Sequence, residues 1–524
     1  MEYDYVIIGA GSAGCVLANR LTADPQCRVL LLEAGGPDKQ AEIHIPAAFN
    51  KLFKTAVDWN YTTAPQPHMH NRELYWPRGK VLGGSSSINA MIYSRANALD
   101  HDAWEMDGWR YNDILPYYKK SEHNERFENS RFHGRGGELN VADLIWASDL
   151  TSGFVAETGD LGLPHNNDVN GATQEGVTFF QVTQKGGQRH SAADAFLKPV
   201  LSRKNLTVIK YALVTKLLFD GTRCVGAAFS RAGQLQQVNA AREVLLCGGT
   251  INSPQTLLLS GVGPADELQC LGIPVVADLP GVGRNLQDHL LIGIEYECKA
   301  PSLTLFKADN PVNLAKYLMF KKGPLTSNVA EAGGFMKSRP SLAIPDIELL
   351  FAPTFYMDHG FANPPVAGVS IGVAIQKPES RGTITLRTSN PDDAPIIQPN
   401  YLQVESDLKV GIEGVKFARE ILQAPVFNSI RGKRLWPAEG ANSDSDIAEH
   451  IRRTSDTFYH PVGTCKMGPD KGDDKEAVVD GSLRVRGLTG LRVIDASVIP
   501  LQITGHTNAP TIAIAEKAAD LLLK

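Results

Sequence analysis

The sequence lacks the cysteine patterns that mark disulfide-rich or zinc-binding proteins. Seven cysteines are scattered through 524 residues, and no two of them form a Cys-x-x-Cys pair. A disulfide framework or a structural zinc site requires closer and more regular spacing. We therefore expect free, mostly buried thiols and a reducing compartment. The cysteines are Cys15, Cys27, Cys224, Cys247, Cys270, Cys298 and Cys465.

An excess of basic charge and long apolar runs are also missing. The formal net charge is −5, which argues against a nucleic-acid partner because such partners favour a basic surface. No stretch reaches the roughly 20 apolar residues of a membrane span. Residues 1–5 lack the basic start of a secretory signal. We expect a cytoplasmic protein, and a peripheral membrane contact stays open because a surface patch leaves no clear pattern in a sequence.

The length of the chain predicts two domains. A chain of 524 residues is too long for one hydrophobic core, and its 43% content of hydrophobic residues is ordinary for a globular protein. The start predicts a βαβ unit with strands at 5–8 and 28–33 around a helix at 15–21. Apolar runs without alternation are typical of parallel strands that are covered on both faces. We find no internal repeat.

Later segments predict a second kind of sheet. Residues 206–209 and 242–247 resemble the first strands, whereas 347–351 and 382–386 favour a mixed or antiparallel sheet. Helices are expected around 410–422 and 510–523. The predicted fold class is α/β, with a Rossmann-like dinucleotide-binding domain on a parallel sheet and an α+β substrate-binding cap domain. We assign residues 1–155, 195–300 and 460–524 to the first domain, and 156–194 and 301–459 to the cap.

A glycine motif follows the first strand directly. In Gly9-Ala10-Gly11-Ser12-Ala13-Gly14, the first glycine permits a tight turn, Gly11 lets the backbone approach a pyrophosphate, and Gly14 lets the helix pack on the strand. Glu33 ends the second strand, where a carboxylate can bind ribose hydroxyls. The pattern predicts a dinucleotide without a 2′-phosphate, and by itself it does not separate FAD from NAD.

The same residues allow a serine hydrolase as an alternative. Residues 10–14 are close to the Gly-x-Ser-x-Gly nucleophile elbow around Ser12, and Asp495 and His506 follow in the order that α/β-hydrolases use. The first glycine of that motif is alanine here, and the serine hydrolase hypothesis gives Glu33 no role. The dinucleotide reading is therefore favoured.

The rest of the chain resembles the glucose–methanol–choline (GMC) family of flavoprotein oxidoreductases over nearly its whole length. The likeness is strongest to choline dehydrogenase-like and aliphatic alcohol dehydrogenases of bacteria. It is carried by residues 78–89 (RGKVLGGSSSIN), 248–264, 281–289 (GVGRNLQDH), 459–468 (YHPVGTCKMG), 493–497 and 505–511 (GHTNAPT).

The resemblance implies FAD as the cofactor. It places Gly83, Gly84 and Ser85 beside the flavin ring, where small residues let the backbone come close, and Asn89 near the reactive edge of the flavin. Some relatives carry a histidine covalently joined to FAD at the position of Ile88, so we expect non-covalent FAD here. The remaining residues that the resemblance assigns to the cofactor are Ala34, Arg78, Asp495, Ala496, Asn508 and Thr511.

Two histidines carry the chemistry that the resemblance implies. His460 matches the catalytic histidine of the family and is the candidate base, because the pKa of histidine lies near neutrality. His506 occupies the second position and would orient the alcohol oxygen and stabilise a developing alkoxide. The expected reaction converts a primary alcohol to an aldehyde with hydride transfer to flavin N5, and the pair should titrate as a coupled unit. No metal is expected.

The sequence does not identify the electron acceptor or the alcohol substrate. A quinone-type acceptor is favoured, with an oxidase that uses O₂ as the alternative, and the fold also serves hydroxynitrile lyases and fatty-acid photodecarboxylases. A structural role for Asp495 as a turn cap is a further alternative.

Each of four other features allows two interpretations. Glu331 could bind a cationic substrate or be a structural acid near the flavin, and we favour the second. Residues 45–53 could be a lid over the substrate channel or ordinary packing. His68 and His70 are expected on the surface rather than at a metal, and Cys465 is expected to pack behind the site rather than act as a nucleophile.

Overall fold

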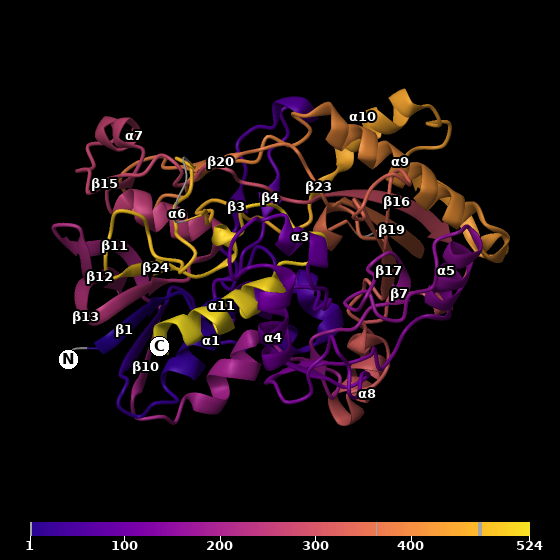
Figure 1. The fold of residues 1–524 in the computed structure, drawn as a ribbon. Helices are drawn as coiled ribbons and strands as arrows, with labels where there is room; N and C mark the ends of the chain where they lie inside the picture. The colour runs from indigo at the N-terminus through magenta and orange to yellow at the C-terminus, as the bar shows by residue number, and fades with distance from the viewer. Residues whose placement is uncertain (1–2, 363, 470–473, 524) are drawn as a thin grey trace.

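The computed structural model describes residues 3–362, 364–469 and 474–523 and contains two large sheets with helices packed on them (Figure 1). In the first sheet the order is β10-β2-β1-β13-β12-β11, and β24 also pairs with β13. Strands β1, β2, β10, β24 and the end of β13 are parallel, and the start of β13 continues into an antiparallel extension. The bounds are β1 Tyr3–Ile8, β2 Val29–Glu33, β10 Leu206–Lys210, β11 Leu213–Asp220, β12 Arg223–Arg231, β13 Gln234–Leu246 and β24 Leu491–Val493.

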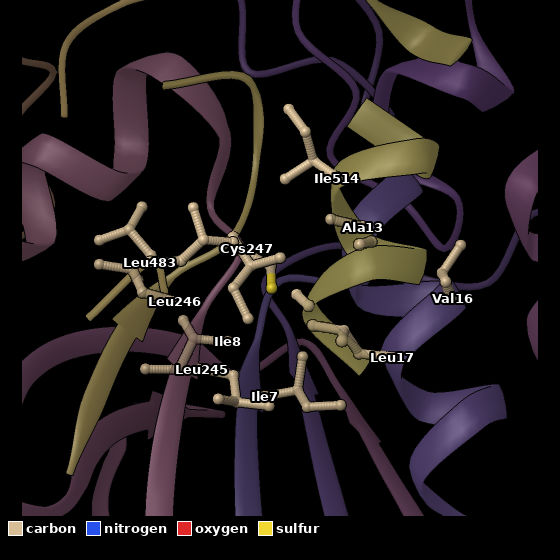
Figure 2. Packing of buried hydrophobic residues seen from close by; sticks show 14 of the residues in the cluster. Ile7, Ile8, Ala13, Val16, Leu17, Leu245, Leu246, Cys247, Leu483 and Ile514 are labelled. Atoms are coloured by element: carbon tan, nitrogen blue, oxygen red, sulfur yellow. The ribbon is translucent and has the colours of Figure 1, made fainter. Parts of the chain in front are cut away.

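Two helices from opposite ends of the chain pack together on this sheet. Helix α1 (Ser12–Leu21) follows β1, and α11 (Asn508–Leu523) lies beside it. Figure 2 shows apolar side chains of both helices meeting those of β1 and β13. Every residue of β2 is buried, as the unbroken apolar run predicts.

The second sheet is antiparallel throughout. Its order is β17-β18-β19-β16-β22, with β23 paired to β16. Helix α9 (Glu405–Gln423) packs its apolar stripe on this sheet, and α5 (Asp149–Asp160) and α10 (Asp444–Thr454) adjoin it. The strand bounds are β16 Leu290–Cys298, β17 Ala332–Met336, β18 Ile347–Ala352, β19 Gly368–Ile375, β22 Arg431–Trp436 and β23 Asp456–Thr457.

Shorter elements connect the two sheets. The helices are α2 Ala41–His44, α3 Ala98–Asp102, α4 Tyr111–Ser121, α6 Gly249–Leu259, α7 Ala265–Cys270 and α8 Pro311–Phe320. The short strands are β3 Tyr61–Thr62, β4 Tyr75–Trp76, β5 Glu122–Asn124, β6 Leu139–Val141, β7 Gly176–Phe179, β8 Gln184–Lys185, β9 Gln188–Arg189, β14 Val262–Gly263, β15 Ala277–Asp278, β20 Thr383–Thr385 and β21 Ile396–Gln398.

The fold class is confirmed, and two details differ from the predictions. β16 (Leu290–Cys298) pairs with β19 in the second sheet, although its residues lie within the 195–300 segment of the predicted nucleotide domain. The strand expected at 382–386 forms β20, which pairs only with β21 in a separate two-stranded sheet. The rest of the domain division stays a prediction.

Within the described ranges, each helix is too short or too polar to cross a bilayer.

Candidate active site

A cavity of about 630 Å³ runs from the glycine turn after β1 to the inner face of the second sheet. Fifteen of the seventeen predicted site residues line this cavity, and the other two, Gly14 and Gly83, do not. The fifteen are Gly9, Gly11, Ser12, Glu33, Ala34, Arg78, Gly84, Ser85, Asn89, His460, Asp495, Ala496, His506, Asn508 and Thr511.

Each of the three glycines of the first motif has a different structural role. Gly9 has φ +99°, and a Cβ there would lie 2.5 Å from the carbonyl oxygen of Cys247. A Cβ on Gly14 would lie 1.9 Å from the carbonyl oxygen of Gly9, so the helix could not pack this closely on the turn. A Cβ on Gly11 would meet nothing within 4 Å, and this residue faces the cavity. The start of α1 is therefore open to a phosphate group.

Glu33 closes the same end of the cavity. Its carboxylate accepts hydrogen bonds from the backbone N–H groups of Ala10 and Gly35, at 2.8 and 2.7 Å. Burial raises the pKa of Glu33 to about 7, against the opposing effect of those two N–H donors. Ala34 follows it on the cavity wall.

A second glycine turn lies directly over the first. Gly83 and Gly84 have φ of +90° and +54°, and a Cβ on Gly84 would lie 2.7 Å from Cα of Gly11. Further along, Asn89 accepts hydrogen bonds at Oδ1 from Arg189 Nη1 (2.6 Å) and from the N–H of Met91 (3.1 Å). Its amide NH₂ stays available as a donor at the cavity wall.

The C-terminal segment ties the two ends of the chain together at the cavity. Ser12 donates through Oγ to Asn508 Oδ1 at 2.7 Å, which joins the first turns of α1 and α11. Asp495 accepts from the N–H of Gly249 (2.8 Å), from Ser253 Oγ (2.6 Å) and from the N–H of Ser497 (2.8 Å). The capping role that we considered for Asp495 is thus present at a residue that also lines the cavity.

These contacts contradict the hydrolase alternative. Ser12 is hydrogen-bonded to Asn508, Asp495 to serine and backbone donors, and His506 to a glutamate. The three residues do not form the hydrogen-bonded Ser–His–Asp relay that a serine nucleophile requires.

His460 is buried at the cavity wall, and its hydrogen bonds define which nitrogen carries the proton. Its Nδ1 lies 3.1 Å from Nδ1 of His289, and Nε2 of His289 lies 2.9 Å from the carbonyl oxygen of Ile503. Because a carbonyl only accepts, Nε2 of His289 carries a proton, and its Nδ1 accepts from Nδ1–H of His460. Nε2 of a neutral His460 is then left with a free lone pair.

The surroundings keep this pair of rings neutral. Burial, followed by the proximity of His506, His289 and Arg78, lowers the pKa of His460 well below its ordinary value. Burial lowers the pKa of His289 to about 3. The carboxylate of Asp288 accepts from the backbone N–H of His460 at 2.7 Å and fixes its position.

His506 lies beside His460, with 4.6 Å between the ring centroids. Its Nε2 is 2.8 Å from Oε1 of the buried Glu348 on β18. The other oxygen of Glu348 accepts from Gln376 at 3.0 Å, and Gln376 accepts in turn from the N–H of Gly505 at 2.7 Å. The Glu348 carboxylate is therefore fixed, and it can balance a positive charge on His506.

Glu295 lines the cavity on the side of the second sheet, whereas Glu331 does not line the cavity. The carboxylate of Glu331 is buried away from the cavity and accepts from the N–H of Ser148 (2.8 Å) and from the hydroxyls of Ser327 (2.7 Å) and Thr151. These contacts contradict the cation-binding hypothesis for Glu331 and support a structural role, although away from the cavity wall.

Glu295 on β16 lines the cavity next to Trp436 and accepts a hydrogen bond from Ser370. Burial raises its pKa to about 8. Sequence reasoning missed Glu295, Glu348 and the role of His289. The one available signal was that His289 closes the motif at 281–289.

The structure also places the other residues that the sequence analysis considered. Residues 46–52 form a 3₁₀ helix, η1 (Pro46–Leu52), and Phe49 and Phe53 contribute to the cavity wall. His68 is exposed, and His70 lies 3.2 Å from Glu449, with no cluster of metal ligands in the described part of the chain. All seven cysteines are free thiols, and burial raises the pKa of Cys465 well above its ordinary value.

Comparison with known proteins defines the family. The family model "GMC oxidoreductase" matches residues 3–291 with its N-terminal part and 378–515 with its C-terminal part.

The chain belongs to the GMC oxidoreductase family.

Relatives of this GMC chain match along its full length. An "Alcohol dehydrogenase [acceptor]" of Pseudomonas putida is 47% identical, covering 100% of this chain and 96% of the relative. A mitochondrial choline dehydrogenase of Mus musculus is 44% identical, covering 99% and 89%. Among solved structures, pyridoxine 4-oxidase from Mesorbium loti superposes with a TM-score of 0.90 at 33% identity, covering 99% of both chains.

GMC oxidoreductases bind FAD and act on CH–OH groups, and the residues of this chain fit that cofactor. The space left at Gly11 suits a pyrophosphate, and Glu33 suits a ribose. The bare backbone at Gly84 suits a flat ring system. The protein is therefore an FAD-dependent oxidoreductase.

Replacing Gly84 by alanine should sharply reduce the FAD content of the purified protein. The new Cβ would lie 2.7 Å from Cα of Gly11 and push apart the two turns that border the cavity. Gly272→Ala is the matched control, because Gly272 also has a positive φ of +69° but has open space around it. Both variants bear the left-handed backbone cost of about 1–2 kcal/mol. Equal FAD-to-protein absorbance ratios for the two variants would contradict the prediction.

Proposed function

We propose that this enzyme oxidises a primary alcohol to an aldehyde and that His460 is the base. The observation that carries the proposal is the hydrogen-bond chain from Ile503 through His289, which leaves Nε2 of His460 unprotonated at the cavity wall beside His506. Nε2 accepts the hydroxyl proton of the alcohol, and the carbon then loses hydride as the C=O bond forms. FAD, when bound, supplies the hydride acceptor at N5.

His506 orients the alcohol oxygen and stabilises its developing negative charge. Its Nε2–H is directed to Glu348, so Nδ1 is the nitrogen available to the substrate oxygen. The carboxylate of Glu348 lies against this ring and stabilises positive charge on it. Because the two catalytic rings are adjacent, charge on His506 helps to lower the pKa of His460.

We infer that the cofactor is held without a covalent bond. Ile88 lies at the cavity wall and has no nucleophilic atom. The residues that would hold FAD are those of the two glycine turns, Glu33 with Ala34, Arg78, Asn89, and Asp495, Ala496, Asn508 and Thr511. Acid precipitation should release the yellow colour into the supernatant.

A quinone-type acceptor is favoured over O₂. The support is similarity, because the relatives named above at 47% and 44% identity are dehydrogenases. An oxidase on the same fold is the alternative. The paired histidines disfavour the photodecarboxylase alternative, because that reaction does not use histidine chemistry. A lyase, which uses FAD without redox turnover, stays an alternative.

The deciding experiment is an anaerobic absorbance spectrum with primary alcohols added one at a time. Bleaching of the flavin supports the proposed reaction, and slow recolouring in air that a quinone accelerates supports the dehydrogenase. Rapid recolouring with formation of peroxide would identify an oxidase. A yellow protein that no alcohol bleaches would overturn the proposed reaction and favour the lyase or light-driven alternatives.

The pH dependence should report on Glu295 and on the substrate class. Its pKa of about 8 keeps the carboxyl neutral below that pH and charged above it. With an uncharged alcohol, kcat/KM should fall by about tenfold per pH unit above this pKa. The reason is that the charged carboxylate of Glu295 is unfavourable beside the apolar part of a bound substrate. With a quaternary ammonium alcohol, the dependence should invert, since the carboxylate then faces a cation.

Glu295→Gln provides the test for this assignment. The amide keeps the size of the side chain but does not titrate, so either pH dependence should disappear from kcat/KM. Glu413→Gln, at an exposed glutamate on α9, should leave the profile unchanged. An unchanged profile in Glu295→Gln would assign the titration to another group.

A further inference from the structure

Helix α8 presents an unusual surface. Most surface helices bury their apolar residues, but in α8 only Tyr317 is buried and only Asn313 is half-buried. The described residues include sixteen large apolar side chains that are exposed, and five of them lie on this ten-residue helix. They are Val312 (76% exposed), Leu314 (40%), Leu318 (60%), Met319 (67%) and Phe320 (63%). In Figure 1, α8 lies at the lower edge of the molecule.

The apolar side chains are directed away from the protein. Val312, Ala315 and Met319 have the i, i+3, i+7 spacing of one helical face, and Tyr317 lies about half a turn from that face. Since Tyr317 packs inward, this face points outward. A contiguous exposed apolar patch of this kind marks an interaction surface.

The helix is firmly attached despite its exposure. Tyr317 Oη donates to the carbonyl oxygen of His44 at 2.9 Å, and Asn310 caps the helix by accepting from the N–H of Asn313 at 3.0 Å. Asp309 forms an ion pair with Lys51 of η1 at 3.1 Å. The patch is therefore a fixed feature of the fold, joined to the segment that contributes Phe49 to the cavity wall.

The charge around α8 is opposite to that of the whole chain. Four lysines lie on or next to the helix, whereas the only acid in residues 299–324 is Asp309, which is paired. The chain as a whole carries −5. A basic border around an apolar face complements an anionic bilayer, in which the headgroups are negative and the interior is apolar. The lysines are Lys307, Lys316, Lys321 and Lys322.

We propose that α8 docks the enzyme on the surface of an anionic lipid bilayer. The side chains of Val312, Leu318 and Met319 enter the boundary between headgroups and acyl chains, and the lysines contact the headgroups. A helix of ten residues is too short to span a bilayer and lies along its surface. A second copy of the chain fits less well, since self-association would bring two lysine clusters together.

Docking in this way goes beyond the proposed reaction and does not depend on it. Because α8 and η1 are linked, the bilayer would lie next to the segment that borders the cavity. A lipid-soluble alcohol or acceptor could then pass between membrane and cavity without crossing water.

The test is flotation of the FAD-loaded protein with vesicles of phosphatidylcholine and phosphatidylglycerol. The wild type should float with them, and binding should weaken on vesicles of phosphatidylcholine alone and in high salt. The double variant Val312→Gln/Met319→Gln should lose at least about tenfold in partition coefficient, because two large apolar contacts are removed. Leu235→Gln is the matched control at an equally exposed residue (65%) on β13.

Charge is tested separately. Lys316→Glu/Lys322→Glu, at two exposed lysines, should abolish binding to anionic vesicles, whereas Lys204→Glu/Arg231→Glu, at exposed residues near and on the first sheet, should retain it. Absence of wild-type binding, or equal binding by the α8 variants, would overturn the proposal. A wild-type dimer that Val312→Gln/Met319→Gln converts to a monomer would also overturn it, because a second copy would then cover the patch. Bleaching by a water-soluble alcohol should be unaffected in all these variants.

Discussion

Replacing His460 by alanine is expected to slow the bleaching of the flavin by alcohol about 10²–10⁴-fold. The variant loses Nε2, the only nitrogen of the His460–His289 pair that its hydrogen bonds leave as a free acceptor. It should stay yellow, because the FAD-binding turns near Gly11 and Gly84 are untouched. The measurement is the rate of bleaching under anaerobic single-turnover conditions, which isolates the chemical step from the choice of acceptor.

The control for this variant is His70→Ala. His70 is exposed and bonds only to Glu449 in the described structure, so its loss should leave the rate within error of the wild type. The low pKa of His460 adds a second criterion, since the base is already deprotonated at neutral pH. With an uncharged alcohol, the rate of bleaching should therefore not rise further above pH 7. A His460→Ala rate within tenfold of the wild type would remove His460 from the role of base.

The N-terminal part of the site could be predicted from sequence because its geometry is local. Gly9, Gly11 and Gly14 lie within six residues, between a strand and a helix. A Cβ at Gly9 or Gly14 would clash with the backbone, and Gly11 leaves bare backbone at the cavity wall. The carboxylate of Glu33 reaches the same turn because parallel strands β1 and β2 are neighbours. Such short-range constraints leave a readable pattern in the sequence.

The substrate end could not be predicted in the same way, because it depends on contacts between distant segments. His506 and Glu348 are 158 residues apart, and nothing near either residue indicates the other. The sequence around Glu331 allowed the hypothesis that this acid binds a cationic substrate. Only the structure reveals that Ser148 and Ser327 donate hydrogen bonds to its oxygens. Glu295 itself lies on β16, which joins the second sheet by pairing with the distant strand β19.

The tautomer of His460 illustrates the same limit. The motif around residue 460 indicates a catalytic histidine but not which nitrogen is free. That property depends on a carbonyl of Ile503, reached through His289 from a different motif. The chemistry of a histidine is therefore specified by its hydrogen-bond partners rather than by its own motif.

His506→Ala is expected to reduce the rate of bleaching by about 10²–10³-fold, as the loss of one donor to a developing oxyanion does in other enzymes. Glu348→Gln should cause a smaller loss in the same step, because an amide keeps a hydrogen-bond acceptor for His506 but supplies no negative charge. If Glu348 acts only through His506, the double variant should be no slower than His506→Ala. The readouts are the bleaching rates of all four proteins.

Glu331→Gln separates this positioning role from the general effect of removing a buried acid. Both carboxylates are fully buried, but Glu348 reaches a catalytic histidine, whereas Glu331 is bonded to Ser148, Thr151 and Ser327 away from the cavity. We expect Glu331→Gln to lower thermal stability and leave the bleaching rate per bound flavin unchanged. Additive losses in the double variant, or equal losses in Glu348→Gln and Glu331→Gln, would assign to Glu348 a structural role independent of His506.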